Sequence, residues 1–498
     1  MSGKHWAVQL AALSLGLCAA TTTAQAQSLF LASDWLKAYP PGMTPQSPLG
    51  TALPGRGEPA MACGSDEVSS PLSLVKAIDI ALCQNPQLRA SWAAIKVQAG
   101  AVGEAKASQL PTATLSAGEV RDRMGYPGTE LPGTGQRTHT LYGNVAWRLF
   151  DFGGKAANQR YAGALLDSAL ANHDAVLQKT LASVIAAYFD VQTAAATWTA
   201  RQQMETLARQ TLETARRREA RGAGSQTDTL QATTAAAKAT LERSRALGSY
   251  QRAVAVLGYS MGLPLSEKWS SGFAAPEGLT SSNGAEGAEA GKELASLKDL
   301  RLSLDEWLSQ AMERHPALQA ARAQVQAARE RTTVVQSEGL PTLDATGNLY
   351  QNGRPNQGVM PKTRETTLGL SLSIPLFEGF ARRYKVAGAQ AQLEQKEAEL
   401  KDAERQVVME LVKAHADATS ALNNLDASLQ LLDAATQAMA SAQRKFDKGA
   451  ADVTEILNTQ TALADATLER IRGQADWRSA RLRLFANAGE LSRMEFGQ

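Results

Sequence analysis

The chain contains two copies of one sequence pattern. Residues 72–120 recur at 302–350 with a constant offset of 230 positions, and residues 150–262 recur with an offset of 227. Because the offset changes by only three positions, the match indicates a duplicated structural unit rather than shared composition. Solenoid repeats have periods of about 20–50 residues. The longer period here predicts two copies of a whole subdomain, packed about a pseudo-symmetry axis.

The first 26 residues predict an export signal. Lys4 begins it, a mostly apolar run follows at 6–20, and Ala24-Gln25-Ala26 offers small residues for cleavage. The apolar run is too short for a permanent membrane helix. Because no later run reaches about 18 apolar residues, the sequence also argues against an inner-membrane helix.

The remainder of the chain divides by composition. We expect an N-terminal extension at 27–70, a first repeat at 71–265, a linker at 270–300 and a second repeat at 301–490. The extension and the linker lack hydrophobic periodicity and are rich in turn-forming residues, as irregular segments are.

The charge and the cysteine content bear on the possible partners of the chain and on a possible disulfide. The net charge is +2, from 51 basic and 49 acidic residues with both signs interspersed, which argues against a nucleic-acid partner. Cys63 and Cys83 remain after the export signal is removed. In an oxidising compartment they either form a disulfide, worth on the order of 3 kcal/mol, or stay two unpaired thiols.

Each repeat is expected to contain one long helix. The patterns from about Lys155 to Ala220 and from about Arg382 to Asp447 are unbroken by proline. At 1.5 Å per residue, such a helix is about 100 Å long. Its apolar residues step by threes, fours and sevens, which is typical of coiled-coil packing. Helices of roughly half this length are expected at about 72–109, 226–262, 302–339 and 453–488.

A β-hairpin is expected in each repeat, at about 112–149 and about 342–376, with loops at about 121–138 and 351–365. Apolar and small or polar residues alternate along both hairpins, as in a membrane-spanning barrel strand or in a soluble hairpin. The sequence offers no other sheet to cover the apolar faces, which favours contact with lipid. The alternating residues are Leu115, Ala117, Leu141, Val145, Trp147 and Leu149 in the first hairpin, and Leu343, Ala345, Gly347, Leu349, Leu368, Leu370, Leu372 and Ile374 in the second.

Four strands are too few to close a barrel around a passage. An open sheet edge in lipid is excluded because its backbone groups would lack partners. Other copies of the chain must therefore complete the sheet. Three chains would supply roughly twelve strands, enough for an open lumen, although this arithmetic does not require three.

These features resemble the TolC-like outer-membrane efflux proteins. The resemblance rests on the duplicated helix–hairpin–helix plan, the Leu-Pro before each hairpin, and the exit sequence Ile374-Pro375-Leu376-Phe377-Glu378-Gly379. It implies a homotrimer in the Gram-negative outer membrane, with a twelve-stranded barrel and a periplasmic helical tunnel, working with a periplasmic adaptor and an inner-membrane ABC or other pump. Within the family, the chain is most similar to non-acylated type I secretion channels such as the CyaE-like exporters. Two departures are Arg148, where the second repeat has Pro375, and the shifted glycines after Phe152.

The resemblance also implies where the channel narrows. Glu455 matches an acidic position of the family's periplasmic constriction, Asn458 stands where a second acid is usual, and Asp228 is the counterpart of Glu455 in the first repeat. Three copies of Glu455 would form a carboxylate ring that favours cations. Alternatively, Asp228 and Glu455 are acids that stabilise a helix start. The helix-ending turns, expected at Gly222, Ala223, Gly449 and Ala450, are the predicted adaptor contacts.

The function predicted from the sequence is an exit duct for type I protein secretion, with drug or metal efflux as the alternative. A secreted coiled-coil scaffold explains the heptads but not the duplicated hairpins. No catalytic, cofactor or metal site is expected, because His139, His173, His315 and His415 are scattered and no nucleophile motif occurs. Near each turn, Arg217 and Arg444 are expected either to cap the helix end by bonding its last carbonyls or to take part in docking, and capping is preferred.

Overall fold

The computed structural model describes residues 72–124, 128, 134–263, 303–352, 363–448 and 450–489. The predicted export signal, N-terminal extension and linker therefore lie outside the described residues. The chain divides into two compact units. Within the described residues, the first unit comprises Ile95–Asp167 and Ala323–Lys396, and the second unit comprises the remainder.

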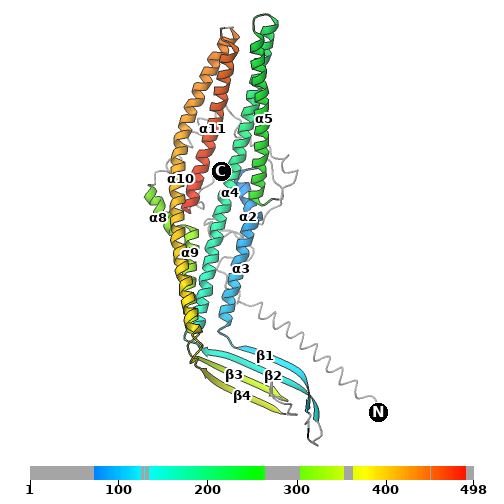
Figure 1. The fold of residues 1–498 in the computed structure, drawn as a ribbon, viewed down its shortest axis with the longest axis vertical. Coiled ribbons are helices and arrows are strands. Elements are labelled where there is room, and N and C mark those ends of the chain that lie inside the picture. Colours follow the sequence, from blue (N-terminus) through cyan, green and yellow to red (C-terminus); the bar gives the residue numbers. More distant parts are fainter. Residues whose placement is uncertain are drawn as a thin grey trace, which may run out of the picture. The chain divides into compact units, whose positions relative to one another are not determined.

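Both repeats have the same order of elements, as the duplication predicts. In the first they are α2 (Leu74–Gln84), α3 (Pro86–Ala107), β1 (Thr112–Met124), β2 (Thr134–Phe150), α4 (Gly154–Ala220) and α5 (Gln226–Met261). In the second they are α8 (Leu304–Arg314), α9 (Pro316–Ser337), β3 (Thr342–Gln351), β4 (Arg364–Ser373), α10 (Ala381–Asp447) and α11 (Val453–Ala488), all labelled in Figure 1. The mainly helical fold with a four-stranded sheet is confirmed.

The long helices form as predicted, but the first helical region of each repeat is broken. We expected single helices at about 72–109 and 302–339; each is instead two helices, separated at Asn85 and at His315. Both residues precede a proline and are extended, with ψ of 120° and 122°. Proline disfavours the helical conformation in the preceding residue and lacks an N–H for the helix ladder.

The two hairpins form one antiparallel sheet in the first unit, with strand order β1-β2-β3-β4. Val145 of β2 pairs with Gly347 of β3, and Gly347 pairs with Leu368 of β4. This register places the predicted apolar residues of both hairpins on one face, and the polar residues on the other. β1 extends to Met124 and β2 starts at Thr134, so the first loop is shorter than expected.

The alternation fails at one position. A register shift between Arg148 and Phe150 places Phe150, rather than the expected Leu149, opposite Leu343. A β-bulge adds one residue to one strand, so every side chain beyond it changes face. Such a shift cannot be read from the alternation pattern, because Leu149 and Phe150 are both apolar.

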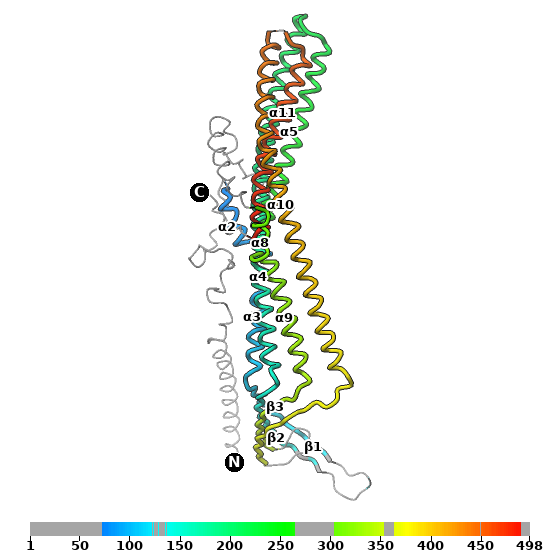
Figure 2. The backbone as a smooth tube through the Cα atoms, turned by 90° about the vertical axis from the view of Figure 1, so that its left-hand side faces the viewer, coloured from blue at the N-terminus to red at the C-terminus, as the bar shows by residue number. Residues whose placement is uncertain are grey.

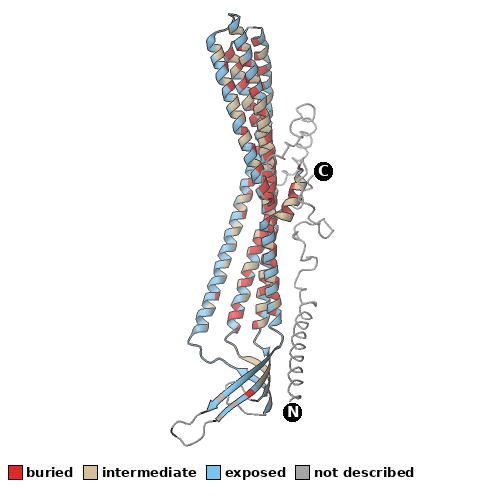
Figure 3. Cartoon of the chain, turned by 90° about the vertical axis from the view of Figure 1, so that its right-hand side faces the viewer, coloured by how far each residue is buried: buried red, intermediate tan, exposed pale blue. Residues whose placement is uncertain are grey.

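Buried side chains of the second unit form one apolar core for each repeat. The first core joins α2 to α4 and α5, and Tyr188 of α4 donates its hydroxyl proton to the Leu72 carbonyl at 3.1 Å. The second core joins α8 to α10 and α11 around Trp307 and Trp477, both 1% exposed. Figure 3 shows buried residues along these helices, while the strands are mostly half-buried or exposed.

Asn85 and His315 occupy equivalent joints and make the same contact. The Asn85 side chain accepts a hydrogen bond from the Gln87 N–H at 2.9 Å, and His315 Nδ1 accepts one from the Ala317 N–H at 3.3 Å. Burial lowers the pKa of His315, partly opposed by the charge of Glu410. The histidine is therefore held neutral, as the acceptor role of Nδ1 requires.

A pH dependence follows from the lowered pKa of His315. Since its folded pKa lies below the ordinary value of 6.5, its stabilising contribution is complete above pH 6.5 and is lost as the pH falls through the folded pKa. We expect His315→Asn, the residue of the first repeat, to reduce the loss of Tm between pH 7.5 and pH 5. Thermal unfolding of both proteins at each pH measures this. Equal losses would contradict the role of His315; the raised pKa of Asp190, caused mainly by burial, is common to both proteins.

Candidate functional site

The turn after α4 and the turn after α10 lie together at one end of the second unit (Figures 1 and 2). A buried apolar cluster joins the two helix pairs there, so the turns of both repeats form one structure. We call this region the tip. Its buried residues are Ala215, Ala232, Met439, Ala442, Phe446, Ala451, Val453 and Ile456.

Both turns have the same backbone contact. The Ala223 N–H donates to the Arg218 carbonyl at 2.9 Å, and the equivalent Ala450 N–H donates to the Lys445 carbonyl at 2.8 Å. Gly222 has a φ of 71°, the left-handed conformation expected for a residue that ends a helix. Gly222, Ala223 and Ala450 are exposed, and Gly449 lies outside the described residues. These positions remain predicted adaptor contacts.

Arg218 connects α4 to α10 at the tip, a contact that was not predicted from the sequence. Its guanidinium donates to the Phe446 carbonyl and lies 4.0 Å above the Phe446 ring, which is 1% exposed. The expected caps, Arg217 and Arg444, are exposed and make no such contact in the described structure, so that prediction is wrong. Arg218 differs because it is directed toward α10, where Phe446 supplies a carbonyl and an aromatic face.

The two predicted constriction acids stand in the first turns of α5 and α11. Asp228 forms a capping box with Ser225: the Ser225 N–H donates to Asp228 Oδ2 and the Asp228 N–H donates to Ser225 Oγ, both at 3.1 Å. This is the helix-start role that the sequence left open. In α11 the cap is Asp452, which accepts from the Glu455 N–H at 2.7 Å. The Glu455 carboxylate is therefore not needed for capping.

The Glu455 carboxylate instead pairs with a lysine of the same tip. Its Oε1 lies 3.2 Å from Nζ of Lys445, and both side chains are partly exposed, at 42% and 56%. Asn458 follows one helical turn later and is exposed. Residues three apart on a helix are neighbours. The structure therefore presents Glu455 and Asn458 together at the tip, and their place at a constriction remains a prediction.

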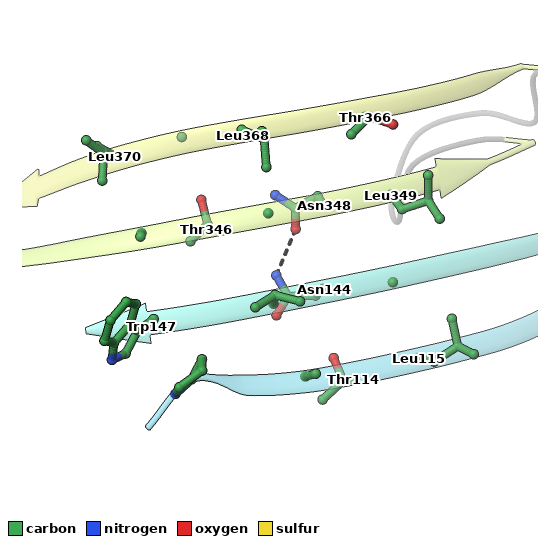
Figure 4. Close-up of a pocket in the computed structure, with 17 residues that line it drawn as sticks. Thr114, Leu115, Asn144, Trp147, Thr346, Asn348, Leu349, Thr366, Leu368 and Leu370 are labelled. Carbon is green, nitrogen blue, oxygen red and sulfur yellow. Dashed lines mark hydrogen bonds between the residues drawn. The ribbon is translucent and has the colours of Figure 1, made fainter. Parts of the chain in front are cut away.

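The polar face of the sheet is the second candidate surface. Asn144 Nδ2 and the Tyr142 hydroxyl both donate to Asn348 Oδ1, at 2.8 Å and 3.1 Å, and the first of these bonds is drawn in Figure 4. Tyr142 also stacks on Tyr350, with ring centroids 5.0 Å apart. These cross-strand contacts join β2 to β3, and so join the two repeats.

The opposite face of the sheet is apolar and hollowed. Ala113, Leu115, Val145, Leu349 and Leu368 are among the residues that line the hollow, several of which are shown in Figure 4. Leu368, Leu370 and Leu372 are 84%, 71% and 62% exposed. A patch of large apolar side chains with this exposure indicates a surface that is covered by lipid or by protein.

Membrane barrels carry girdles of aromatic residues at their interfaces, and β2 contains two candidates for such a girdle, Trp147 and Tyr142. Trp147 lies on the apolar face and donates from Nε1 to the Gln109 carbonyl at 2.9 Å. Tyr142 lies on the polar face, because it is five positions along the strand and side chains alternate. The two residues therefore cannot belong to the same girdle.

Three further observations concern the described residues. No helix there is long and apolar enough to cross a membrane. No group of three or more His, Cys, Asp or Glu side chains there could hold a metal ion. Cys83 forms a disulfide, and Cys63, its predicted partner, lies outside these residues.

The fold and the two surfaces define a class of protein. A duplicated helical chain that contributes one amphipathic four-stranded sheet is the subunit of an outer-membrane channel. The chain belongs to the outer membrane efflux protein family, whose model matches residues 77–263 and 307–490. The predicted resemblance and the outer-membrane location are thereby confirmed. The family and the fold are those of channels rather than enzymes.

Three similar proteins show how far the likeness extends. Protein CyaE of Bordetella pertussis is 36% identical over 428 residues, which cover 85% of each chain. The alkaline protease secretion protein AprF of Pseudomonas aeruginosa is 24% identical over 186 residues, covering 37% of this chain and 39% of AprF. The structure of the outer membrane protein VceC of Vibrio cholerae superposes with a TM-score of 0.69 at 20% identity, over 84% of this chain and 96% of VceC.

Proposed function

We propose that this chain is the exit duct of a type I protein secretion system, acting as a homotrimer. The observation that carries the proposal is the sheet with one polar and one apolar face. Among the described residues, the outer edges of β1 and β4 have no partner strand. Unpaired edges are not tolerated in lipid, so neighbouring subunits must supply the missing strands. Three subunits give twelve strands, with the apolar face in lipid and the Asn144–Asn348 face in the lumen.

A passive duct needs partners that supply energy. The sequence contains no nucleotide-binding loop, so an inner-membrane pump must drive export and a periplasmic adaptor must connect the two. The exposed turn at Gly222 and Ala223 and the exposed Ala450 offer short helix ends to helical hairpins of the adaptor.

The similarity to CyaE and AprF favours a protein as the exported cargo over drugs or metals. The similarity to CyaE extends over most of both chains, and AprF is named for the secretion of a protease. The fold itself does not discriminate, since VceC shares it at low identity. Deleting the gene tests the proposal. We expect one large protein to disappear from the culture supernatant, while sensitivity to drugs and metals stays unchanged; the reverse result would favour small-molecule efflux.

The proposed constriction at Glu455 predicts a change in channel conductance and ion selectivity. Three copies of Glu455 around the channel axis would favour cations, and each is balanced by Lys445 in its own subunit. We expect Glu455→Ala to raise single-channel conductance in planar bilayers and to lower the cation preference by about twofold or more. Glu469→Ala is the control, because Glu469 is an exposed α11 acid paired with Arg472. Unchanged conductance and selectivity in Glu455→Ala would remove Glu455 from the constriction.

A further inference from the structure

The duplication repeats one tetrapeptide in equivalent places. Thr240-Leu241-Glu242-Arg243 in α5 recurs as Thr467-Leu468-Glu469-Arg470 in α11. Several local contacts recur as well. The hydroxyls of Thr240 and Thr467 donate to carbonyls one turn earlier, at 3.1 Å and 2.7 Å. Glu242 and Glu469 each pair with an arginine three residues later, at 2.9 Å and 2.7 Å. The two sites can therefore be compared atom by atom.

The comparison shows that one carboxylate is missing in the second repeat. Arg243 Nε lies 2.8 Å from Glu205 Oε2, whose side chain is 8% exposed and also accepts from the Thr240 hydroxyl at 2.8 Å. The position equivalent to Glu205 is Leu432. Arg470 therefore lacks the acid that its counterpart has. Its Nη1 donates to the Leu425 carbonyl at 2.9 Å, and its buried Nε has no hydrogen-bond partner.

A cavity lies beside the position of the missing acid. It has a volume of about 250 Å³ and lies between α4, α10 and α11 in the second unit, with Leu432, Thr467 and Arg470 in its wall. No aspartate or glutamate lines it. Phe189, Ala196 and Ile471 provide apolar wall, and the amides of Gln192, Gln203 and Gln474 provide additional hydrogen-bonding groups.

We propose that this cavity binds a small organic carboxylate, with Arg470 as the residue that recognises the charge. Arg470 is half-buried, and its buried Nε lacks a hydrogen-bond partner. A buried polar group without a partner is costly, and a carboxylate supplies the best-matched partner through charge-assisted hydrogen bonds. The Glu205–Arg243 pair shows that this backbone setting accommodates a carboxylate at the required place. The volume equals that of roughly eight waters at about 30 Å³ each. The ligand is therefore of benzoate size, with its apolar part against Phe189 and Ile471. The site lies away from the tip residues and does not depend on the proposed cargo.

Benzoate binding to the purified full-length protein in detergent tests this site. We expect isothermal titration to show saturable binding of benzoate, and thermal unfolding to show a higher Tm in its presence. Benzamide, which is neutral and of the same shape, should bind at least about tenfold more weakly. Titration with inorganic phosphate tests whether any anion can bind at this site. If phosphate binds as tightly as benzoate, the assignment to an organic carboxylate is overturned.

Two variants separate recognition from folding. Arg470→Gln should weaken benzoate binding by about tenfold or more, because the charge-assisted bonds are lost. Leu432→Glu rebuilds the carboxylate of the first repeat, so it should raise the Tm without ligand and abolish the benzoate response. Arg472→Gln is the matched control: it removes an exposed arginine on the same helix and should leave binding unchanged.

Four outcomes would contradict the proposal. It is overturned if the wild-type protein does not respond to benzoate, if benzamide is equivalent, or if Leu432→Glu still binds. It is also overturned if a structure of the assembled protein shows a carboxylate of a neighbouring subunit on Arg470.

Discussion

Replacing Leu370 with arginine is expected to abolish assembly of the channel in the outer membrane. Leu370 is 71% exposed on the apolar face of β4, opposite Ala345 of β3. An arginine on the lipid face near the middle of a barrel costs about 2–4 kcal/mol. In a trimer the substitution occurs three times, so the total cost is roughly 6–12 kcal/mol. That is comparable with the whole stability of a typical domain.

The adjacent residue provides the control. Ser371 pairs with Asp344 and points to the polar face, so Ser371→Arg places the same charge on the side assigned to the lumen. We expect Ser371→Arg to assemble at close to the wild-type level, and Leu370→Arg to leave little oligomer that resists detergent in unheated gel samples. Equal assembly of the two variants would show that the apolar face does not contact lipid.

Replacing Gly262 with alanine is expected to destabilise the second unit by roughly 2–5 kcal/mol, the sum of two costs. Gly262 ends α5 with a φ of 77°, a conformation that costs a residue with a Cβ about 1–2 kcal/mol. A Cβ there would also lie 2.8 Å from both the Asn85 Cα and the Gln84 carbonyl oxygen. Because these are backbone atoms, relief requires the α2–α3 joint to move, and such overpacking costs about 1–3 kcal/mol.

The duplication again provides the control. Gly489 ends α11 with a φ of 79°, but a Cβ there would approach nothing closer than 3.5 Å, at the Cα of His315. Gly489→Ala should therefore cost only the backbone term of about 1–2 kcal/mol. Thermal or urea unfolding of both variants measures the difference. If Gly262→Ala is no less stable than Gly489→Ala, the close approach of α5 to the joint is not present in solution.

Much of the fold could be predicted from the sequence because the relevant signals are local and occur twice. The proline-free heptads of α4 and α10 predict long helices within one or two residues of their ends. The alternation in the hairpins predicts the apolar residues that share a face, since side chains alternate along any strand. The breaks at Asn85 and His315 were missed even though each precedes a proline; weighing the proline signal against helical periodicity would have found them.

The contacts of the functional surfaces could not be predicted in the same way. The sequence identifies Glu455 as an acid near a helix start, but its partner Lys445 is on the other side of a turn. Arg217 and Arg218 are neighbours in the sequence, and only the packing of α4 against α10 brings Arg218 to Phe446. The bulge at Arg148 has no compositional signal, because it depends on the register between β2 and β3.

The sequence by itself determined the duplication, the helical and strand segments, and an amphipathic sheet with too few strands to stand alone. Periodicity and turn-forming residues act over a few positions, so they can be read along one chain. Only the tertiary structure decided which side chains meet across the two repeats. Leu432 matches Glu205 in position, yet its replacement of an acid becomes meaningful only because α4, α10 and α11 enclose a cavity beside Arg470. Whether a buried charge has a partner depends on contacts between segments far apart in the chain, and those contacts are set by packing.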